Sequence, residues 1–218
     1  MTIRHHFSDA LLMAYAAGTL PEAFALVAAT HLSLCDECRA ALAAFEAVGG
    51  AVLDTTDAEP MGAHCLADTL ERLDTPTEGR AERTRSAPEP RRGVLPAPLQ
   101  DYIGGDLDQV KWRPIGMGVR QAILPTSGGG TVRLLHIPAG QSVPDHGHRG
   151  LELTLVLQGA FRDDTARFGP GDVEIATEEL EHTPVAEAGQ DCICLAATDA
   201  RLRFNSLIPR LAQPFLRI

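Results

Sequence analysis

The sequence contains no apolar run that approaches the roughly 20 residues needed to cross a bilayer. Its N-terminus also lacks the apolar core and cleavage site of a secretory signal peptide, so we expect a cytoplasmic protein that does not contact a membrane. Disulfide frameworks are rare in that reducing compartment. The five cysteines are therefore expected to bind metal, to sense oxidants or to be buried as inert thiols.

The chain also lacks an excess of positive charge, since 19 Lys and Arg stand against 29 Asp and Glu, a formal net charge of −10. Residues 1–75 hold 3 Arg and 11 Asp and Glu, which gives −8, whereas residues 76–98 carry +2 and residues 99–218 carry −4. An acidic surface repels the phosphate backbone. The balance argues against direct nucleic-acid binding and favours a basic protein partner.

Composition divides the chain into two small domains, which we expect at residues 1–75 and 99–218. The stretch 76–98 between them is rich in proline and charge and has few apolar residues, which predicts a flexible linker. Apolar residues recur at helical spacing over residues 8–48, and a further short helix is expected at about 64–73. Ser8 is a candidate N-cap, and Thr19 through Glu22 resemble a capping box.

From residue 99 onward, short β-type runs alternate with Gly and Pro, which is typical of an all-β sandwich or barrel. The clearest runs are residues 131–138, 151–158, 172–177 and 191–197. Within residues 151–157 the alternation places four leucines on one face of a strand and Glu152, Thr154 and Val156 on the other. We expect one face to form the barrel interior and the other to be covered by a second sheet or a second subunit.

The spacing His31-x-x-x-Cys35-x-x-Cys38 places an imidazole and two potential thiolates within two helical turns. Two sulfurs and an imidazole favour Zn²⁺ in tetrahedral coordination, which requires a fourth protein ligand. His5 and His6 are both candidates. The alternative is that these are unrelated residues on an alanine-rich helix pair.

A second constellation lies in the β-rich half. His146-x-His148 puts two imidazoles on one side of an extended segment, Glu152 follows at the start of the next strand, and His182 can supply a distant fourth ligand. This set suits Zn²⁺, with Mn²⁺, Fe²⁺, Ni²⁺ or Cu²⁺ as further possibilities. The alternative is a polar turn with surface histidines.

Two more thiols flank Ile193 in a predicted strand. Cys192 and Cys194 point to the same face, where buried inert thiols are the common case. The rival interpretation is that one of them faces the metal cavity and is oxidisable, which makes both redox candidates.

His6 followed by His31-x-x-x-Cys35-x-x-Cys38 resembles the signature of zinc-binding anti-sigma factors. The resemblance implies that His6, His31, Cys35 and Cys38 hold zinc in a small helical domain that binds a group IV (extracytoplasmic-function, ECF) sigma factor. It also implies that the helical domain keeps this sigma factor from RNA polymerase.

The second constellation resembles the two cupin motifs. The first motif fits without gaps, but His182 lies farther from Pro170-Gly171-Asp172 than the cupin pattern has it and lacks the customary Asn after it. A zinc anti-sigma domain ahead of a cupin barrel resembles the ChrR-type anti-sigma factors over essentially the whole chain. That resemblance implies a cupin required to release the sigma factor in response to singlet oxygen or organic peroxide.

The predicted fold is thus a small helical zinc-binding domain followed by a cupin β-barrel, in a regulator that is not an enzyme and has no catalytic residues. We expect a protease as a further possible partner on release. The alternative function is a metal-dependent cupin dioxygenase or isomerase. No cluster that would act as a substrate-positioning base is evident in the barrel sequence, and an enzyme has no need of a thiolate-rich zinc module.

Overall fold

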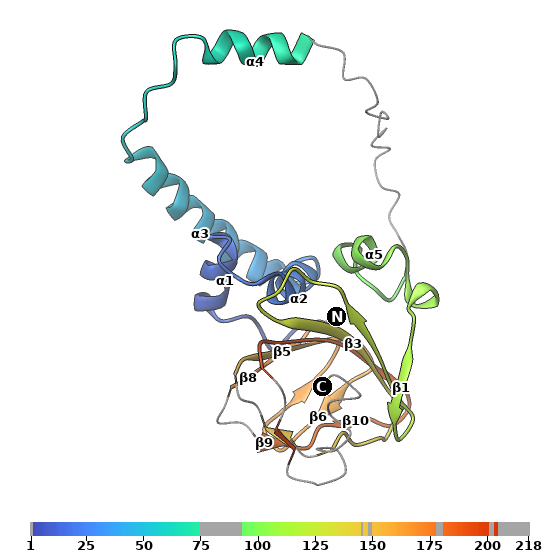
Figure 1. Cartoon of the computed structure of the whole chain (residues 1–218). Helices are drawn as coiled ribbons and strands as arrows, with labels where there is room; N and C mark the ends of the chain where they lie inside the picture. Colours follow the sequence, from blue (N-terminus) through green and yellow to red (C-terminus); the bar gives the residue numbers. More distant parts are fainter. Residues whose placement is uncertain are drawn as a thin grey trace.

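The computed structural model describes residues 2–74, 93–144, 146–147, 150–177, 181–200 and 203–204. Helices occupy the N-terminal part and a β-barrel the C-terminal part, so the predicted fold class is confirmed (Figure 1). The helices are α1 (Asp9–Ala16), α2 (Glu22–Leu32), α3 (Asp36–Asp54), α4 (Cys65–Asp74) and α5 (Ala97–Ile103), with a short 3-10 helix η1 (Leu107–Gln109).

The barrel is built from antiparallel strands in three sheets. A six-stranded sheet has the order β1-β2-β3-β11-β5-β8, and the orders of the two three-stranded sheets are β10-β6-β7 and β12-β4-β9. The four strands expected from the sequence appear within one residue of their predicted ends, as β3, β5, β8 and β11. The strands are β1 (Arg113–Gly116), β2 (Val119–Leu124), β3 (Thr131–Ile137), β4 (His146–Gly147), β5 (Glu152–Gln158), β6 (Phe161–Arg162), β7 (Arg167–Phe168), β8 (Val173–Ala176), β9 (Glu181–His182), β10 (Val185–Ala186), β11 (Cys192–Thr198) and β12 (Arg203–Phe204).

The ends of the first helices follow local side-chain chemistry. Ser8 caps α1 as predicted, because its hydroxyl accepts a hydrogen bond from the backbone N–H of Leu11. The predicted capping box at Thr19 is wrong. The Thr19 hydroxyl donates back to the carbonyl of Ala14, and α2 begins after Pro21 without a side-chain cap.

The large sheet buries its two faces in different ways. Glu152 and Thr154 of β5 face a cavity inside the barrel, and Val156 packs in an interior cluster, as the alternation predicted. The leucines on the other face pack against α2, which lies across the sheet (Figure 1). The expected cover was therefore wrong, since the chain's own helical domain occupies the place assigned to a second sheet or subunit.

The two domains consequently share one apolar core. Phe24 and Val27 of α2 are 2% and 0% exposed, and they belong to the same buried cluster as Leu134, Leu155 and Leu195 of the barrel sheet. The linker prediction remains a prediction, because residues 75–92 lie outside the described part of the chain. Beyond it Leu95 is already buried and α5 begins at Ala97.

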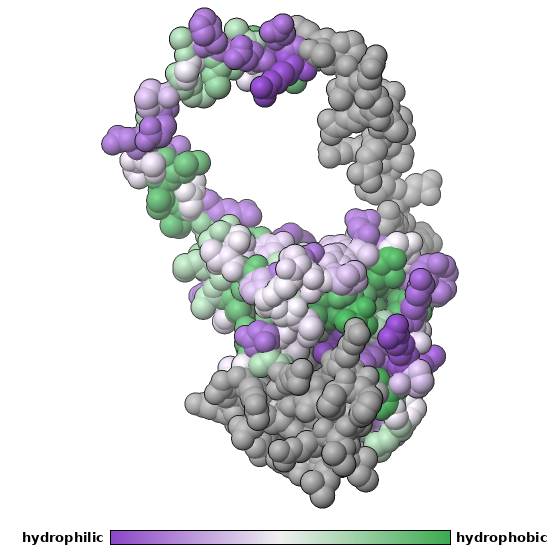
Figure 2. All heavy atoms as spheres, viewed as in Figure 1, coloured by the Kyte–Doolittle hydropathy of each residue, from purple (hydrophilic) through white to green (hydrophobic). Residues whose placement is uncertain are grey.

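The second half of α3 and all of α4 extend away from this core (Figure 1). Every residue from 46 to 73 is exposed. Green apolar surface is visible on both helices in Figure 2. None of the helices in the described residues has the length and apolarity that a membrane span requires.

Candidate metal centres

Four potential metal ligands from three segments converge in the helical domain. His6 precedes α1, His31 lies in the last turn of α2, Cys35 is the N-cap of α3, and Cys38 lies in the first turn of α3. One ligand atom of each lies within 4.8 Å of those of the other three. The structure thus brings together the set that the anti-sigma resemblance implied.

His5, the other candidate for the fourth position, is used differently. Its ring packs on that of Phe168 in the barrel, with centroids 4.4 Å apart. His6 Nδ1 instead lies 3.3 Å from the sulfur of Cys35 and 3.6 Å from that of Cys38. The geometry therefore favours His6.

The distances fit tetrahedral zinc. Bond lengths of about 2.3 Å to sulfur and about 2.0–2.1 Å to nitrogen place neighbouring S and N ligands about 3.5 Å apart. The His31 Nε2 to Cys38 Sγ distance is 3.2 Å, close to this value and to the two distances from His6. Zinc would tie the N-terminal segment to α2 and α3 at one point.

Burial sets the protonation of two members of this cluster, His31 and Cys38. It lowers the pKa of His31 to about 4, so the imidazole is neutral at neutral pH, as a metal ligand must be. It raises the pKa of the Cys38 thiol to about 11. A bound cation would reverse the effect on Cys38, because a coordinating thiol is deprotonated.

In the barrel, only part of the predicted ligand set can be placed. His148 and the side chain of His146 lie outside the described residues. The backbone pairing of β4 with β9 puts residue 146 directly opposite His182. Glu152 and His182 both line a cavity of about 80 Å³ inside the barrel.

His182 is held between two carboxylates. Its Nδ1 lies 3.0 Å from an oxygen of Asp163 and 3.1 Å from Oε1 of Glu174, and the His182 side chain is buried. Burial disfavours the charged imidazole, but the two carboxylates outweigh it and raise the pKa of His182 to about 9. Burial raises the pKa of Glu174. Its Oε1 receives no well-directed hydrogen bond although it lies within ion-pair distance of His182.

Sequence reasoning missed these carboxylates and a cation. Asp163 and Glu174 form a second cluster with His182 whose ligand atoms lie within 4.8 Å of one another. Arg133 of β3, 6% exposed, also faces the cavity and donates to the side chain of Gln121 at 3.1 Å. An acidic residue inside the buried run 172–177 was the available signal for Glu174. Asp163 lies in a turn and gave no such signal.

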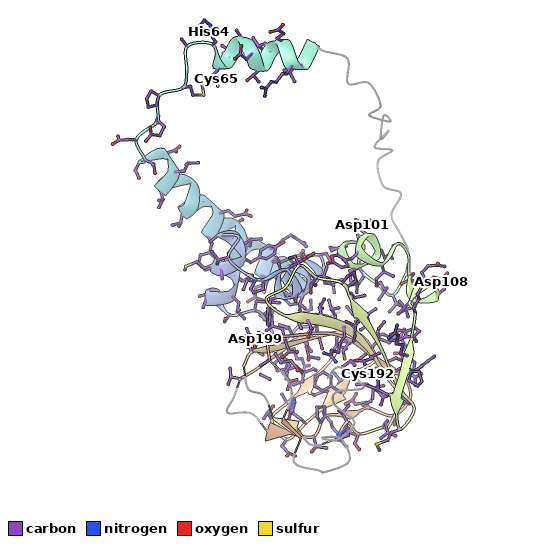
Figure 3. The ribbon with its side chains drawn as sticks, viewed as in Figure 1. His64, Cys65, Asp101, Asp108, Cys192 and Asp199 are labelled. Carbon is purple, nitrogen blue, oxygen red and sulfur yellow. The ribbon has the colours of Figure 1, made fainter. Side chains whose placement is uncertain are left out.

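The two barrel thiols are buried, as the packing interpretation expects, and their redox role stays a prediction. Cys192 and Cys194 are unbridged and 3.4 Å apart at sulfur. The hydrogen bond with Cys192 and burial together raise the pKa of Cys194. Cys194 lines the same cavity as Glu152 and His182. Cys192 is labelled inside the barrel in Figure 3, where Cys65 lies far from both centres at the start of α4.

Comparison with known proteins matches this architecture. The family model described as the ChrR cupin-like domain matches residues 100–201. The anti-sigma-E factor ChrR of Cereibacter sphaeroides is 64% identical over 218 residues, which is the full length of both chains.

A solved structure is similar over both domains. It is the crystal structure of Rhodobacter sphaeroides SigE in complex with the anti-sigma factor ChrR. Its match has 62% identity, covers 90% of this chain and 99% of that chain, and has a TM-score of 0.79.

Proposed function

This chain belongs to the ChrR family of anti-sigma factors, and from that premise we propose that it binds and inhibits a group IV (ECF) sigma factor through its N-terminal zinc domain. The cupin barrel is the sensory part, required to release the sigma factor in response to singlet oxygen or organic peroxide. In this function the barrel regulates an interaction and catalyses no reaction. The protein would act in the cytoplasm, where its sigma partner works.

The observation that carries the proposal is the exposed apolar surface of α3 and α4. Of the ten large exposed hydrophobic residues in the described part of the chain, seven lie between residues 48 and 73. Exposed large apolar residues gathered in one region of the chain mark an interaction site. The seven residues, here called the α3–α4 apolar surface, are Val48, Val52, Leu53, Met61, Leu66, Leu70 and Leu73, with Met61 in the segment between the two helices.

The partner's chemistry follows from the surroundings of this surface. Residues 1–75 carry a net charge of −8, so a partner with basic character is favoured. A sigma factor binds DNA and has that character. Covering its surface with two acidic amphipathic helices would block both polymerase and DNA.

We assign zinc to His6, His31, Cys35 and Cys38, where it would fix the start of α3 and so the direction of the helix that carries part of this surface. Cys35 and Cys38 lie at the start of α3, the helix that carries the first part of the α3–α4 apolar surface. A helical domain this small gains much of its folding free energy from a structural metal. Without zinc, α3 would lose its fixed direction relative to α2.

For the barrel we propose a divalent metal, with zinc favoured, held by His146, His148, Glu152 and His182. Without metal the pKa of His182 is about 9, so a metal would have to displace the proton on its other nitrogen. The carboxylates at Nδ1 would then orient that nitrogen toward the metal, an arrangement common around metal-bound histidines. The metal would supply a positive charge that lowers the pKa of nearby thiols. Cys192 or Cys194 could then be oxidised by a hydroperoxide to a sulfenic acid, with release of the corresponding alcohol.

The proposal is tested by affinity purification of the tagged protein from its native host. Wild type and the Cys35→Ser/Cys38→Ser variant are compared, and co-purified proteins are identified by mass spectrometry. Cys192→Ser/Cys194→Ser is the matched control, because these two cysteines lie in the barrel, outside the cluster and away from the α3–α4 apolar surface. We expect a sigma factor with the wild type and with this control, and none with the Cys35→Ser/Cys38→Ser variant.

Absence of a sigma factor from all three samples would overturn the anti-sigma function. A metal-dependent cupin enzyme would then be the leading alternative. The same purification after oxidant treatment would show whether a protease takes part in releasing the sigma factor. Cleaved fragments of the anti-sigma chain would indicate proteolysis, and an intact chain would indicate a conformational change.

A further inference from the structure

One turn of the barrel, residues 170–172, lies directly against the zinc cluster of the helical domain. It precedes β8 and contacts both sides of the cluster: the ring of His31 on α2 and the backbone that leads into His6. The two domains therefore meet at the cluster itself as well as at the apolar face of the large sheet.

The first contact involves a ligand candidate. Nδ1 of His31 lies 2.9 Å from the carbonyl oxygen of Gly171, and both groups are buried. A carbonyl can only accept, so this bond requires the proton on Nδ1 and leaves the lone pair on Nε2, the atom 3.2 Å from Cys38 Sγ. Gly171 has φ 88°, a conformation that glycine adopts without strain.

The second contact positions the segment that carries His6. One carboxylate oxygen of Asp172 accepts hydrogen bonds from the backbone N–H groups of Arg4 at 2.6 Å and His5 at 3.0 Å. The other oxygen accepts from Gly169 N–H at 2.8 Å. Asp172 is only 3% exposed, so an unpaired donor here would cost more than one in water.

One further backbone hydrogen bond joins the same segment to the start of β8. The backbone N–H of Val173 donates to the carbonyl of His5 at 3.2 Å, and the ring of His5 packs on Phe168. Residues 4–5 are thus fixed by the barrel immediately before the chain reaches His6.

We propose that Gly171 and Asp172 are positioning residues for the N-terminal zinc, so that the cupin barrel completes the outer shell of the anti-sigma domain's metal site. This inference rests on the zinc assignment in the proposed function. It adds a physical route between the two centres, because β8 begins directly after Asp172 and carries Glu174, whose Oε1 lies 3.1 Å from Nδ1 of His182. A rearrangement around His182 that displaces β8 loosens the zinc ligands directly.

The chain's own five cysteines allow a site-resolved test. Wild-type, Asp172→Asn and Arg4→Pro chains are incubated in a zinc buffer with an alkylating reagent, and each cysteine is followed by peptide mass spectrometry. Cys35 and Cys38 report the zinc site. Buried Cys192 and Cys194 report opening of the barrel, and exposed Cys65 reports the reagent itself.

The two variants weaken the hydrogen bonds between Asp172 and the N-terminal segment, one from the acceptor side and one from the donor side. Asp172→Asn leaves only one side-chain oxygen, so the residue can no longer accept from both Gly169 N–H and the N-terminal segment. Arg4→Pro removes one backbone donor without changing the barrel sequence. Asp106→Asn is the matched control. Asp106 likewise accepts from two consecutive N–H groups, those of Val94 and Leu95, at 3.0 and 2.8 Å, and no described hydrogen bond joins it to the cluster.

Loss of an outer-shell partner lowers metal affinity by about 10–100-fold. We expect Cys35 and Cys38 to be alkylated at least about tenfold faster in Asp172→Asn and in Arg4→Pro, with protection restored by higher zinc. Cys65, Cys192 and Cys194 should react at wild-type rates, and Asp106→Asn should match the wild type throughout.

Two negative results have different meanings. If added zinc does not protect Cys35 and Cys38 in the wild type, the zinc site of the proposed function is wrong. If zinc protects them equally in the wild type and in Arg4→Pro, with the barrel thiols unreactive, the positioning role is refuted while the zinc site stands. If Cys192 and Cys194 are also alkylated faster in Asp172→Asn, that variant has opened the barrel. The positioning role is then decided by Arg4→Pro alone, since that variant leaves the barrel sequence intact.

Discussion

Truncation of Phe24 tests the shared core between the helical domain and the barrel. Phe24 on α2 is 2% exposed, and its ring lies 3.2 Å from where a Cβ on Gly130 of the barrel would be. A buried phenylalanine removes about 150–250 Å² from water, an upper estimate of about 4–6 kcal/mol at about 25 cal/mol per Å². Measured Phe→Ala losses in cores are about 3–5 kcal/mol. We therefore expect Phe24→Ala to cost about 4 kcal/mol.

Urea unfolding followed by two probes measures this loss of stability and shows whether it affects both domains. Far-UV circular dichroism reports the helices. Fluorescence of Trp112, the single tryptophan, reports the barrel, because its ring lies 5.7 Å from that of His136 on β3. With a slope of about 2 kcal/mol per M, the midpoint should fall by about 2 M in both signals. Val52→Ala, at a site 62% exposed, should change stability by less than about 0.5 kcal/mol.

The two probes separate the possible failures. If only the helical signal moves, the domains unfold independently and the core is not shared. If neither signal moves, α2 does not pack on the barrel in solution.

Three further predictions concern the function. Leu66→Glu with Leu70→Glu, on one face of α4, should weaken sigma binding at least about tenfold in calorimetric titration, because a charge would be buried in the complex; unchanged affinity would remove α4 from the docking surface. Glu152→Gln should lower the metal content of the purified chain by about one ion per chain, measured by elemental mass spectrometry, since an amide is a poorer ligand than a carboxylate; a full metal complement would exclude Glu152 as a ligand. Cys192→Ser with Cys194→Ser should slow hydroperoxide-induced release of the sigma factor, followed by loss of co-purification; release at the wild-type rate would leave these thiols with a packing role alone.

The sequence by itself determined the local features of this protein. Ser8 caps α1 because a hydroxyl at that position satisfies a helix-end donor, whatever the rest of the fold does. The alternation in β5 likewise assigned Leu153 and Leu155 to one face and Glu152 to the other. The spacing of His31, Cys35 and Cys38 is local too, since all three lie within eight residues, at the end of α2 and the start of α3. These features depend only on residues close together in the sequence, so the sequence is sufficient to predict them.

The tertiary structure decided what meets across long separations. The choice of His6 over His5 depends on the barrel, which takes up the ring of His5 on Phe168 and clamps the backbone before His6 through Asp172. The cover of the leucine face is α2, more than a hundred residues away in sequence, and periodicity specifies only that some cover exists. Asp163 and Glu174 meet His182 because three separate strands or turns converge. Such pairings are selected by the packing of whole elements, and the residue pattern of any one element does not contain them.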